Sequence, residues 1–252
     1  MALKTSLVAL WEMDEASGTR VDSHGSNDLT PANTPGNVAG KYSSNALRLV
    51  STSSQYLNIA DNADLSMNNE TFSIAGWVRM TVDNSEAWIA SKWSGSSREY
   101  ILTWSRLSKK FGFSVSNDGT SFTDLEATTF GTPATDGSQW CWIYAYHEQG
   151  VGLGISVNDG TINTATHTGG VYSGTEEFRV GSHPGGFFFI DADIQQLGIW
   201  RKLLDAGDRT AIYNGGTGLA YSAWDAATGH PASRRMGGVK FAGNQSLGMN
   251  RW

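Results

Sequence analysis

The stretch Gln139–Asn158, QWCWIYAYHEQGVGLGISVN, carries the clearest strand pattern in the sequence. Side chains alternate between the two faces of an extended strand. One face of its first half carries the aromatic residues Trp140, Trp142, Tyr144 and Tyr146. The other face carries Cys141, Ile143, Ala145 and His147. Because both faces are largely apolar, we expect this strand to lie inside a sheet that is covered on both sides.

The second half of the stretch predicts a return strand. Glu148, Gln149 and Gly150 form the expected turn, and Val151–Val157 then alternates apolar residues with small ones. The small residues leave room for the aromatic rings of the first strand. We therefore predict the central hairpin of a β-sandwich.

The composition of the whole chain agrees with an all-β protein. Its 252 residues include 30 Gly and 10 Trp, and 17% of them are charged, which is typical of many short strands joined by tight turns. The net charge of −6 offers no general attraction to nucleic acid. The single cysteine, Cys141, permits no internal disulfide and is expected to be a small buried residue.

Further apolar runs predict the other strands of the sandwich. The expected strands are Ser6–Met13, Ala46–Leu49, Gln55–Ile59, Phe72–Met80, Ala87–Ala90, Glu99–Trp104, Lys110–Ser116, Glu177–Gly181 and Ile194–Trp200. The segment SKWSGSSR between Ala90 and Glu99 is expected to be a loop. One short helix is expected after Asp205, which is a suitable N-cap, and it ends at Asn214-Gly215-Gly216.

The composition changes near the end of the chain. Residues 226–252 contain four basic residues and no acidic one, whereas residues 1–225 contain 14 basic and 24 acidic residues. We expect residues 1–225 to form a two-sheet antiparallel jelly-roll sandwich, and residues 226–252 to form an irregular, basic, Gly-rich tail. The tail has apolar points but no period of a helix or strand.

Three separated stretches resemble the laminin-G-like, concanavalin-A-like jelly-roll superfamily of lectins and glucanases. They are LVALWEMDEASGTRVDSHGSNDLT (7–30), FSIAGWVRM (72–80) and the closing segment 178–216, which ends in IQQLGIWRKLLDAGDRTAIYNGG. The resemblance implies two face-to-face antiparallel sheets and ligands on a concave face or at rim loops. Many members bind calcium, glycans or proteins, and some are glycoside hydrolases.

Two departures from the family bear on chemistry. Gln195 and Gln196 stand where the family commonly has acidic residues. Because calcium prefers a cluster of carboxylate oxygens, this difference argues against the family's usual calcium site. Asp22, Asn27, Asp191 and Asp193 remain as possible ligands, so we expect no cofactor and leave calcium open. The closest match to the hydrolases' paired carboxylates is Glu12 and Asp14, but Ser17 replaces the third acid. We therefore expect no enzyme.

Exposed aromatic residues are the expected ligand contacts. Trp93 lies in the expected polar loop, with Tyr100 and Trp104 just beyond it, and these three are the predicted ligand-binding residues. Consecutive aromatic residues cannot all point inward in a strand, so at least one of Phe187, Phe188 and Phe189 should be exposed or buried against a partner.

Three functions remain open. The first is a non-catalytic binding module on a virion surface, phage-like, or an adhesin, attached to other chains of a larger assembly through its tail. The expected partner-binding residues are Arg234, Arg235, Lys240, Phe241, Arg251 and Trp252. The second is a free-standing glycan-binding lectin, and the third is a glycoside hydrolase.

The expected location belongs to the first of these functions, and the sequence adds that it carries no membrane signal. The N-terminal stretch has no apolar core of signal-peptide length before Glu12, and no apolar run reaches the length of a membrane-spanning helix. We expect a virion or extracellular surface location without a classical signal peptide, surface glycans as possible partners, and no membrane insertion.

Overall fold

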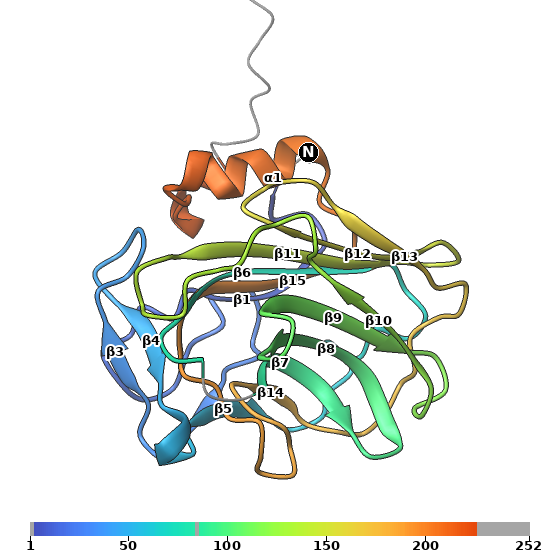
Figure 1. The fold of residues 1–252 in the computed structure, drawn as a ribbon, viewed down its shortest axis with the longest axis horizontal. Coiled ribbons are helices and arrows are strands. Elements are labelled where there is room, and N and C mark those ends of the chain that lie inside the picture. The colour runs from blue at the N-terminus through green and yellow to red at the C-terminus, as the bar shows by residue number, and fades with distance from the viewer. Residues whose placement is uncertain (1–2, 84–85, 226–252) are drawn as a thin grey trace, which may run out of the picture.

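The computed structural model describes residues 3–83 and 86–225, which form two stacked antiparallel sheets with one helix on the outer side (Figure 1). Within these residues, the first sheet has eight strands: β1 (Leu7–Trp11), β3 (Gly36–Val38), β4 (Ala46–Leu49), β6 (Phe72–Met80), β11 (Cys141–Glu148), β12 (Gly152–Val157), β13 (Asn163–Thr166) and β15 (Ala192–Trp200). The second has seven: β2 (Thr30–Ala32), β5 (Tyr56–Ile59), β7 (Ala87–Ser94), β8 (Ser97–Ser105), β9 (Lys110–Ser116), β10 (Phe122–Glu126) and β14 (Phe178–Val180). The predicted jelly-roll sandwich is confirmed.

The central hairpin lies where the sequence predicts it. Strand β11 pairs with β12 on one side and with β6 on the other. Cys141, Ile143 and Ala145 belong to the core between the sheets. Trp142 and Tyr144 belong to a second core on the outer side of the sheet. The prediction of a strand covered on both faces is confirmed.

Glycine makes room for an aromatic ring in this hairpin. A Cβ atom on Gly154 would lie only 2.1 Å from Cε1 of Tyr146 on the paired strand. The close approach of Tyr146 to the backbone therefore requires glycine, as the alternation of large and small residues predicts.

The helix α1 (Ala206–Tyr213) covers the outer face of the eight-stranded sheet. The Asp205 side chain accepts the N–H of Asp208, and Asn214 ends the helix in the left-handed conformation, so both predicted caps are confirmed. The Tyr213 ring stacks on Trp77 with centroids 5.8 Å apart. This packing stabilises a helix that is too short to form by propensity alone. None of the helices described in residues 3–83 and 86–225 has the length and hydropathy needed to cross a bilayer.

One sequence prediction about the strands was wrong, and four strands were missed. The segment SKWSGSSR is not a loop, because β7 extends to Ser94 and β8 begins at Ser97, leaving a two-residue turn at Gly95 and Ser96. Four short edge or near-edge strands, β2, β3, β10 and β13, were not predicted. With three residues each, β2 and β3 are too short to show a pattern, and β10 and β13 are mostly polar, so none of the four has the apolar alternation of a strand.

Candidate functional site

Residues His183–Phe189, here called the aromatic loop, connect β14 to β15 at the end of the sandwich opposite α1 (Figure 1). The main chain of the loop is tied to itself and to β7. The N–H of His183 donates to the carbonyl of Phe187 at 2.9 Å, and the N–H of Trp88 donates to the carbonyl of Phe188 at 3.1 Å. Gly186 takes a φ of +80°, which favours glycine. The loop is therefore held at its base and near its tip.

Three aromatic rings of this loop and Trp88 of β7 form a contiguous cluster. His183 stacks on Phe187 with centroids 4.0 Å apart, and Trp88 lies 4.4 Å from His183. Trp88 also stacks on Phe188 at 5.5 Å, with an angle of 15° between the rings. Phe187 and Phe188 are nevertheless 47% and 38% exposed. The prediction that at least one of Phe187–Phe189 is exposed is confirmed.

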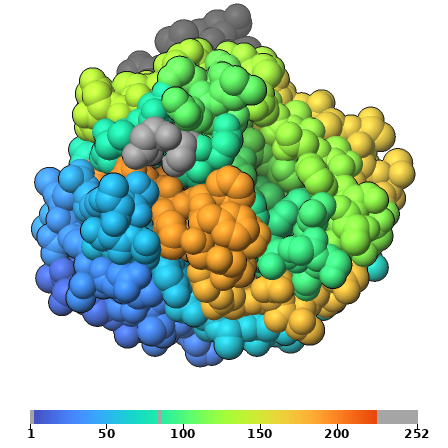
Figure 2. Space-filling model, turned by 60° about the horizontal axis from the view of Figure 1, so that its bottom comes forward, coloured from blue at the N-terminus to red at the C-terminus, as the bar shows by residue number. Residues whose placement is uncertain are grey.

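A cavity of about 1060 Å³ lies beside the aromatic loop. In Figure 2, the orange loop occupies the centre of this face of the molecule. The cavity, here called the rim cavity, is lined by Ser51, Asp83, Glu86, Arg106, Leu107, Lys109, Phe188 and Phe189. Leu107 is 92% exposed, so this end of the sandwich presents apolar surface from two separate loops. Apolar surface from two loops beside one cavity makes this end of the sandwich the candidate interaction site.

The charges around the rim cavity are balanced. Lys109 forms an ion pair with Asp83. The carboxylate of Glu86 accepts the N–H of Leu107 at 3.3 Å and the hydroxyl of Ser105 at 3.4 Å, while Arg106 is exposed. The site thus offers two phenylalanine rings, Phe188 and Phe189, together with charged groups of both signs. This combination suits an uncharged ligand that has both apolar faces and hydroxyl groups.

The three predicted ligand-binding residues lie elsewhere. Tyr100 and Trp104 are fully buried, so their rings have no face open to a ligand. Tyr100 donates its hydroxyl to the carbonyl of Leu65 at 2.8 Å, and Trp104 donates its indole N–H to Asp83 at 3.3 Å. Trp104 therefore reaches the rim cavity only through Asp83. Ligand binding by these residues remains an untested prediction.

Trp93 lies at a different part of the rim. It is 7% exposed and meets the half-exposed Phe122 edge-on at 5.3 Å. The Arg98 guanidinium lies over both rings, at 5.8 Å and 5.5 Å. Trp93 thus supports an exposed phenylalanine rather than presenting its own indole.

The residues predicted to bind a partner chain lie outside the described residues. They are Arg234, Arg235, Lys240, Phe241, Arg251 and Trp252.

The possible calcium ligands do not fit a metal. Asp193 is fully buried and pairs with both Arg48 and Arg79. Asp191 accepts the N–H of Ser51 at 2.9 Å. Across residues 3–83 and 86–225, no group of three or more His, Cys, Asp or Glu side chains is placed to hold a metal ion.

Asp22 is likewise committed to the protein. Its carboxylate accepts backbone N–H groups from Leu10, His24 and Asn27, and the Asn27 side-chain amide as well. Burial alone would raise the pKa of Asp22, but these N–H groups lower it below its usual range. Asp22 thus closes the turn of the opening motif.

Gln195 also has a structural role, in place of the acid common in the family. Its fully buried amide accepts the N–H of Lys41 at 2.6 Å and donates to the carbonyl of Asn45 at 2.9 Å. The amide therefore holds the loop before β4, and it needs no metal to do so.

The acidic residues near the N-terminus hold a loop. Glu12 accepts the Ser23 hydroxyl at 3.4 Å, and Glu15 accepts the N–H of Val21 at 2.7 Å. Burial, and then the charge of Asp14, raise the pKa of Glu12. Through these hydrogen bonds, Glu12 and Glu15 stabilise the segment 15–23.

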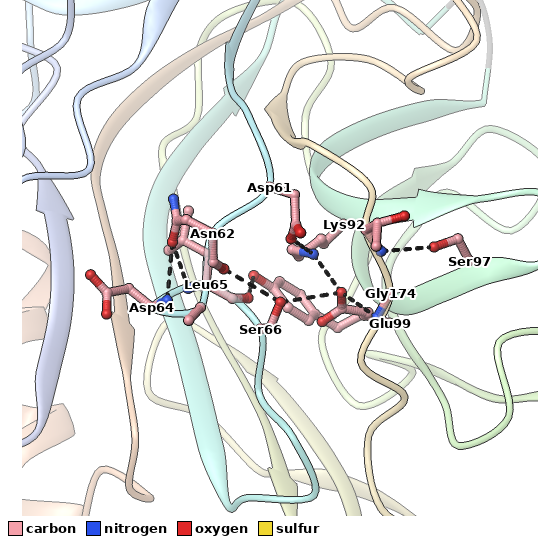
Figure 3. A network of polar contacts seen from close by, with 12 residues as sticks. Asp61, Asn62, Asp64, Leu65, Ser66, Lys92, Ser97, Glu99 and Gly174 are labelled. Atoms are coloured by element: carbon pink, nitrogen blue, oxygen red, sulfur yellow. Dashed lines mark hydrogen bonds and ion pairs between the residues drawn. The ribbon is translucent and has the colours of Figure 1, made fainter.

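A buried polar network lies at another end of the sandwich (Figure 3). Lys92 donates to Glu99 at 2.5 Å and to Asp61 at 2.6 Å. Glu99 also accepts the N–H of Gly174 at 2.9 Å, and the hydroxyl of Ser66 points toward it at 3.5 Å. The network joins the β7–β8 hairpin to the segments around residues 61–66 and 174. Its place in the interior gives it a structural role.

Comparisons with known proteins agree with this fold. A family profile described as the concanavalin A-like lectin/glucanases superfamily matches residues 51–208. The chain belongs to this superfamily. The resemblance expected from the sequence is thereby confirmed. A comparison with curated proteins gives no significant match.

Solved structures of the same fold include toxin binding domains. The binding domain of Paraclostridial Mosquitocidal Protein 1 is 13% identical with a TM-score of 0.68, over 85% of this chain and 53% of that chain. The binding domain of botulinum neurotoxin DC in complex with rat synaptotagmin II is 15% identical, with a TM-score of 0.63 over 84% and 52% of the two chains. The same domain in complex with SialylT is 15% identical, with a TM-score of 0.64 over 84% and 52%. This chain thus spans about half the length of these structures, and the likeness shows the fold.

Proposed function

We propose that this chain is a non-catalytic binding module whose aromatic loop and rim cavity bind an uncharged carbohydrate. One observation carries the proposal: the exposed Phe188 lines a cavity together with a hydroxyl, two carboxylates and two cations, and the exposed Phe187 is its neighbour on the loop. The apolar faces of a sugar stack on aromatic rings, and its hydroxyl groups need donors and acceptors at the edge. Trp88 and His183 hold the rings in place, which lowers the entropic cost of binding.

The similar structures support a binding role rather than identify a ligand. They are named as binding domains, and two of them are complexes with rat synaptotagmin II and with SialylT. Turnover of a bound saccharide that disappears in a Glu12→Gln variant would contradict the non-catalytic part of the proposal.

A glycan array tests the carbohydrate proposal. We expect the chain to bind a defined set of uncharged saccharides, and the Phe187→Ala/Phe188→Ala double variant to lose that binding. Phe122→Ala is a matched control, because Phe122 is also exposed but lies away from the aromatic loop. An array without binding, or equal loss in the control, would refute the proposal.

A second element of the proposal concerns residues 226–252. We infer that they attach the sandwich to a larger particle, such as a virion surface, through basic and apolar side chains. The described chain reaches Asp225 on the α1 side, where Trp224 is buried against Trp200 and Lys4 pairs with Asp225. The aromatic loop lies at the opposite end of the molecule (Figure 1). Attachment at one end would therefore leave the binding end free.

Truncation tests the attachment. A chain that lacks residues 234–252 is expected to fold and to keep saccharide binding, but to fail to join its particle. Unchanged assembly would refute the attachment role and leave the carbohydrate proposal intact.

A further inference from the structure

The side chain and the backbone of His183 both contact other residues of the aromatic loop. Its ring stacks on Phe187 and contacts Trp88 at a tilt, with centroid distances of 4.0 and 4.4 Å. Its main chain donates to Phe187 and accepts the N–H of Gly186, each at 2.9 Å. The position of the exposed rings thus depends on both the ring and the backbone of this one residue.

The hydrogen bonds of the His183 ring specify its protonation state. Nδ1 accepts the N–H of Gly185 at 2.6 Å. A nitrogen that accepts a hydrogen bond carries no proton, so the imidazole is neutral with its proton on Nε2. Adding a proton to Nδ1 would turn this acceptor into a donor that faces the N–H of Gly185.

The nearest charged group, Arg179, also opposes a second proton on the ring. From β14, Arg179 donates to the carbonyl of His183 at 3.0 Å. Glu177 pairs with Arg179, whose guanidinium also lies over the Tyr56 ring of β5 at 4.1 Å. On the following segment Asp191 is bound by Ser51, and β7 contributes the uncharged Trp88 and Ser91. Burial, and then the charge of Arg179, lower the pKa of His183.

We propose that neutral His183 is the positioning residue of the aromatic loop, and that its protonation in mildly acidic solution releases Phe187 and Phe188. The expected consequence is weaker saccharide binding at low pH, and this consequence rests on the proposed carbohydrate site. A charged imidazole still stacks on an aromatic ring. The contact that fails is the hydrogen bond to Gly185, so the turn at Gly185 and Gly186 opens first.

Nuclear magnetic resonance of the full chain without ligand tests the loop directly. At neutral pH, the ¹⁵N signal of His183 Nδ1 is expected to be that of an unprotonated nitrogen. On acidification, the amide signals of Gly185–Phe188 should shift together with the His183 ring, with a midpoint below 6.5, and their heteronuclear NOE should fall. Amide signals that do not follow His183, or an Nδ1 that is protonated at neutral pH, would overturn the proposal.

Two variants separate His183 from the other histidines. His183→Gln keeps a side-chain acceptor but cannot titrate, so its loop signals should not change in this pH range. His24→Gln, at a histidine bonded to Tyr221 on another part of the molecule, should leave the wild-type titration unchanged. The same loop titration in His183→Gln as in the wild type would assign the effect to another group and overturn the proposal.

Binding separates the two proposals. For a saccharide found on the array, we expect at least a tenfold weaker affinity at pH 5 than at pH 7.5 in the wild type, and no such loss in His183→Gln. A wild-type affinity that does not change with pH would contradict the proposed release of Phe187 and Phe188. If no saccharide binds, the proposed function fails, while the loop titration still decides the role of His183.

Discussion

Lys92 and Glu99 form an ion pair inside the sandwich, with Nζ 2.5 Å from Oε1 and both side chains fully buried. The pair lies at the turn end of the β7–β8 hairpin, where a bulge after Lys92 turns both side chains toward the same space. Asp61, which is 35% exposed, provides Lys92 with a second carboxylate (Figure 3). Charged groups thus lie buried beside the apolar core at this end of the sandwich.

Replacing Lys92 should destabilise the protein strongly. Lys92→Met leaves Glu99 buried without its counter-ion, and removing one partner of a buried pair costs about 3–5 kcal/mol. Urea unfolding at pH 8 measures this loss. Lys109→Met is a matched control, because Lys109 pairs with Asp83 but is 47% exposed, and an exposed pair contributes about 1 kcal/mol or less. Equal effects of the two variants would contradict the role of the buried pair.

The stability of the protein should also depend on Glu99 through pH. Burial raises the pKa of Glu99 to about 7 from 4.5, although Lys92 opposes the shift. Between these values the folded state holds a proton that the unfolded state has lost. The contribution of Glu99 to the free energy of unfolding is therefore complete below pH 4.5 and lost as the pH rises through 7.

Unfolding of the wild type and of Glu99→Gln between pH 5 and pH 8 measures this contribution. A shift of that size corresponds to roughly 3 kcal/mol in total, at about 1.4 kcal/mol per pH unit. The stability of the wild type relative to the variant should fall across this range. Parallel stability curves would show that Glu99 has an ordinary pKa in the folded protein.

The sequence predicted most of the sandwich because its central strands are covered on both faces. Phe72–Met80 was predicted with the observed bounds, and β11 differs by little, since nearly every side chain in them is apolar. The helix caps at Asp205 and Asn214 were predicted because capping is a local interaction. Short polar strands such as β10 and β13 carry no such pattern.

The site was harder to predict because it depends on contacts between distant residues. Trp93, Tyr100 and Trp104 were expected in or near a loop, but the hairpin of β7 and β8 turns them into the structure. The run Phe187–Phe189 did signal exposure, since three adjacent rings cannot share one face. Nothing in the sequence places Leu107 or Ser51 beside that run, because only the folded sheets bring them together.

Two glycines of β12 should respond differently to an added methyl group. A Cβ atom on Gly152 would lie 2.3 Å from the carbonyl oxygen of Ala165 on the paired strand, which cannot move without breaking the ladder. On Gly154 it would meet the Tyr146 ring, which can rotate away. We expect Gly152→Ala to cost about 1–3 kcal/mol, and Gly154→Ala less.

Chemical denaturation of both variants checks this order. Gly131→Ala is the control, because a Cβ atom at Gly131 meets nothing within 4 Å. A larger loss in Gly154→Ala than in Gly152→Ala would contradict the packing at β12 and β13.

Calcium should not change the stability of the sandwich. Asp193 is held by two arginines, and Asp22 by backbone N–H groups, so neither carboxylate is available to a metal. The melting temperature is expected to be the same in millimolar calcium and in a chelator. A calcium-dependent rise that disappears in Asp22→Asn would contradict this assignment.

Chemical-shift perturbation shows directly where a bound saccharide lies on the protein. With an uncharged saccharide selected on the array, we expect shift changes to concentrate at Phe187–Phe189, Leu107 and Ser51, and to vanish in the Phe187→Ala/Phe188→Ala variant. Changes centred on Phe122 and Trp93, or on the outer face beneath α1, would show that this protein binds its ligand elsewhere.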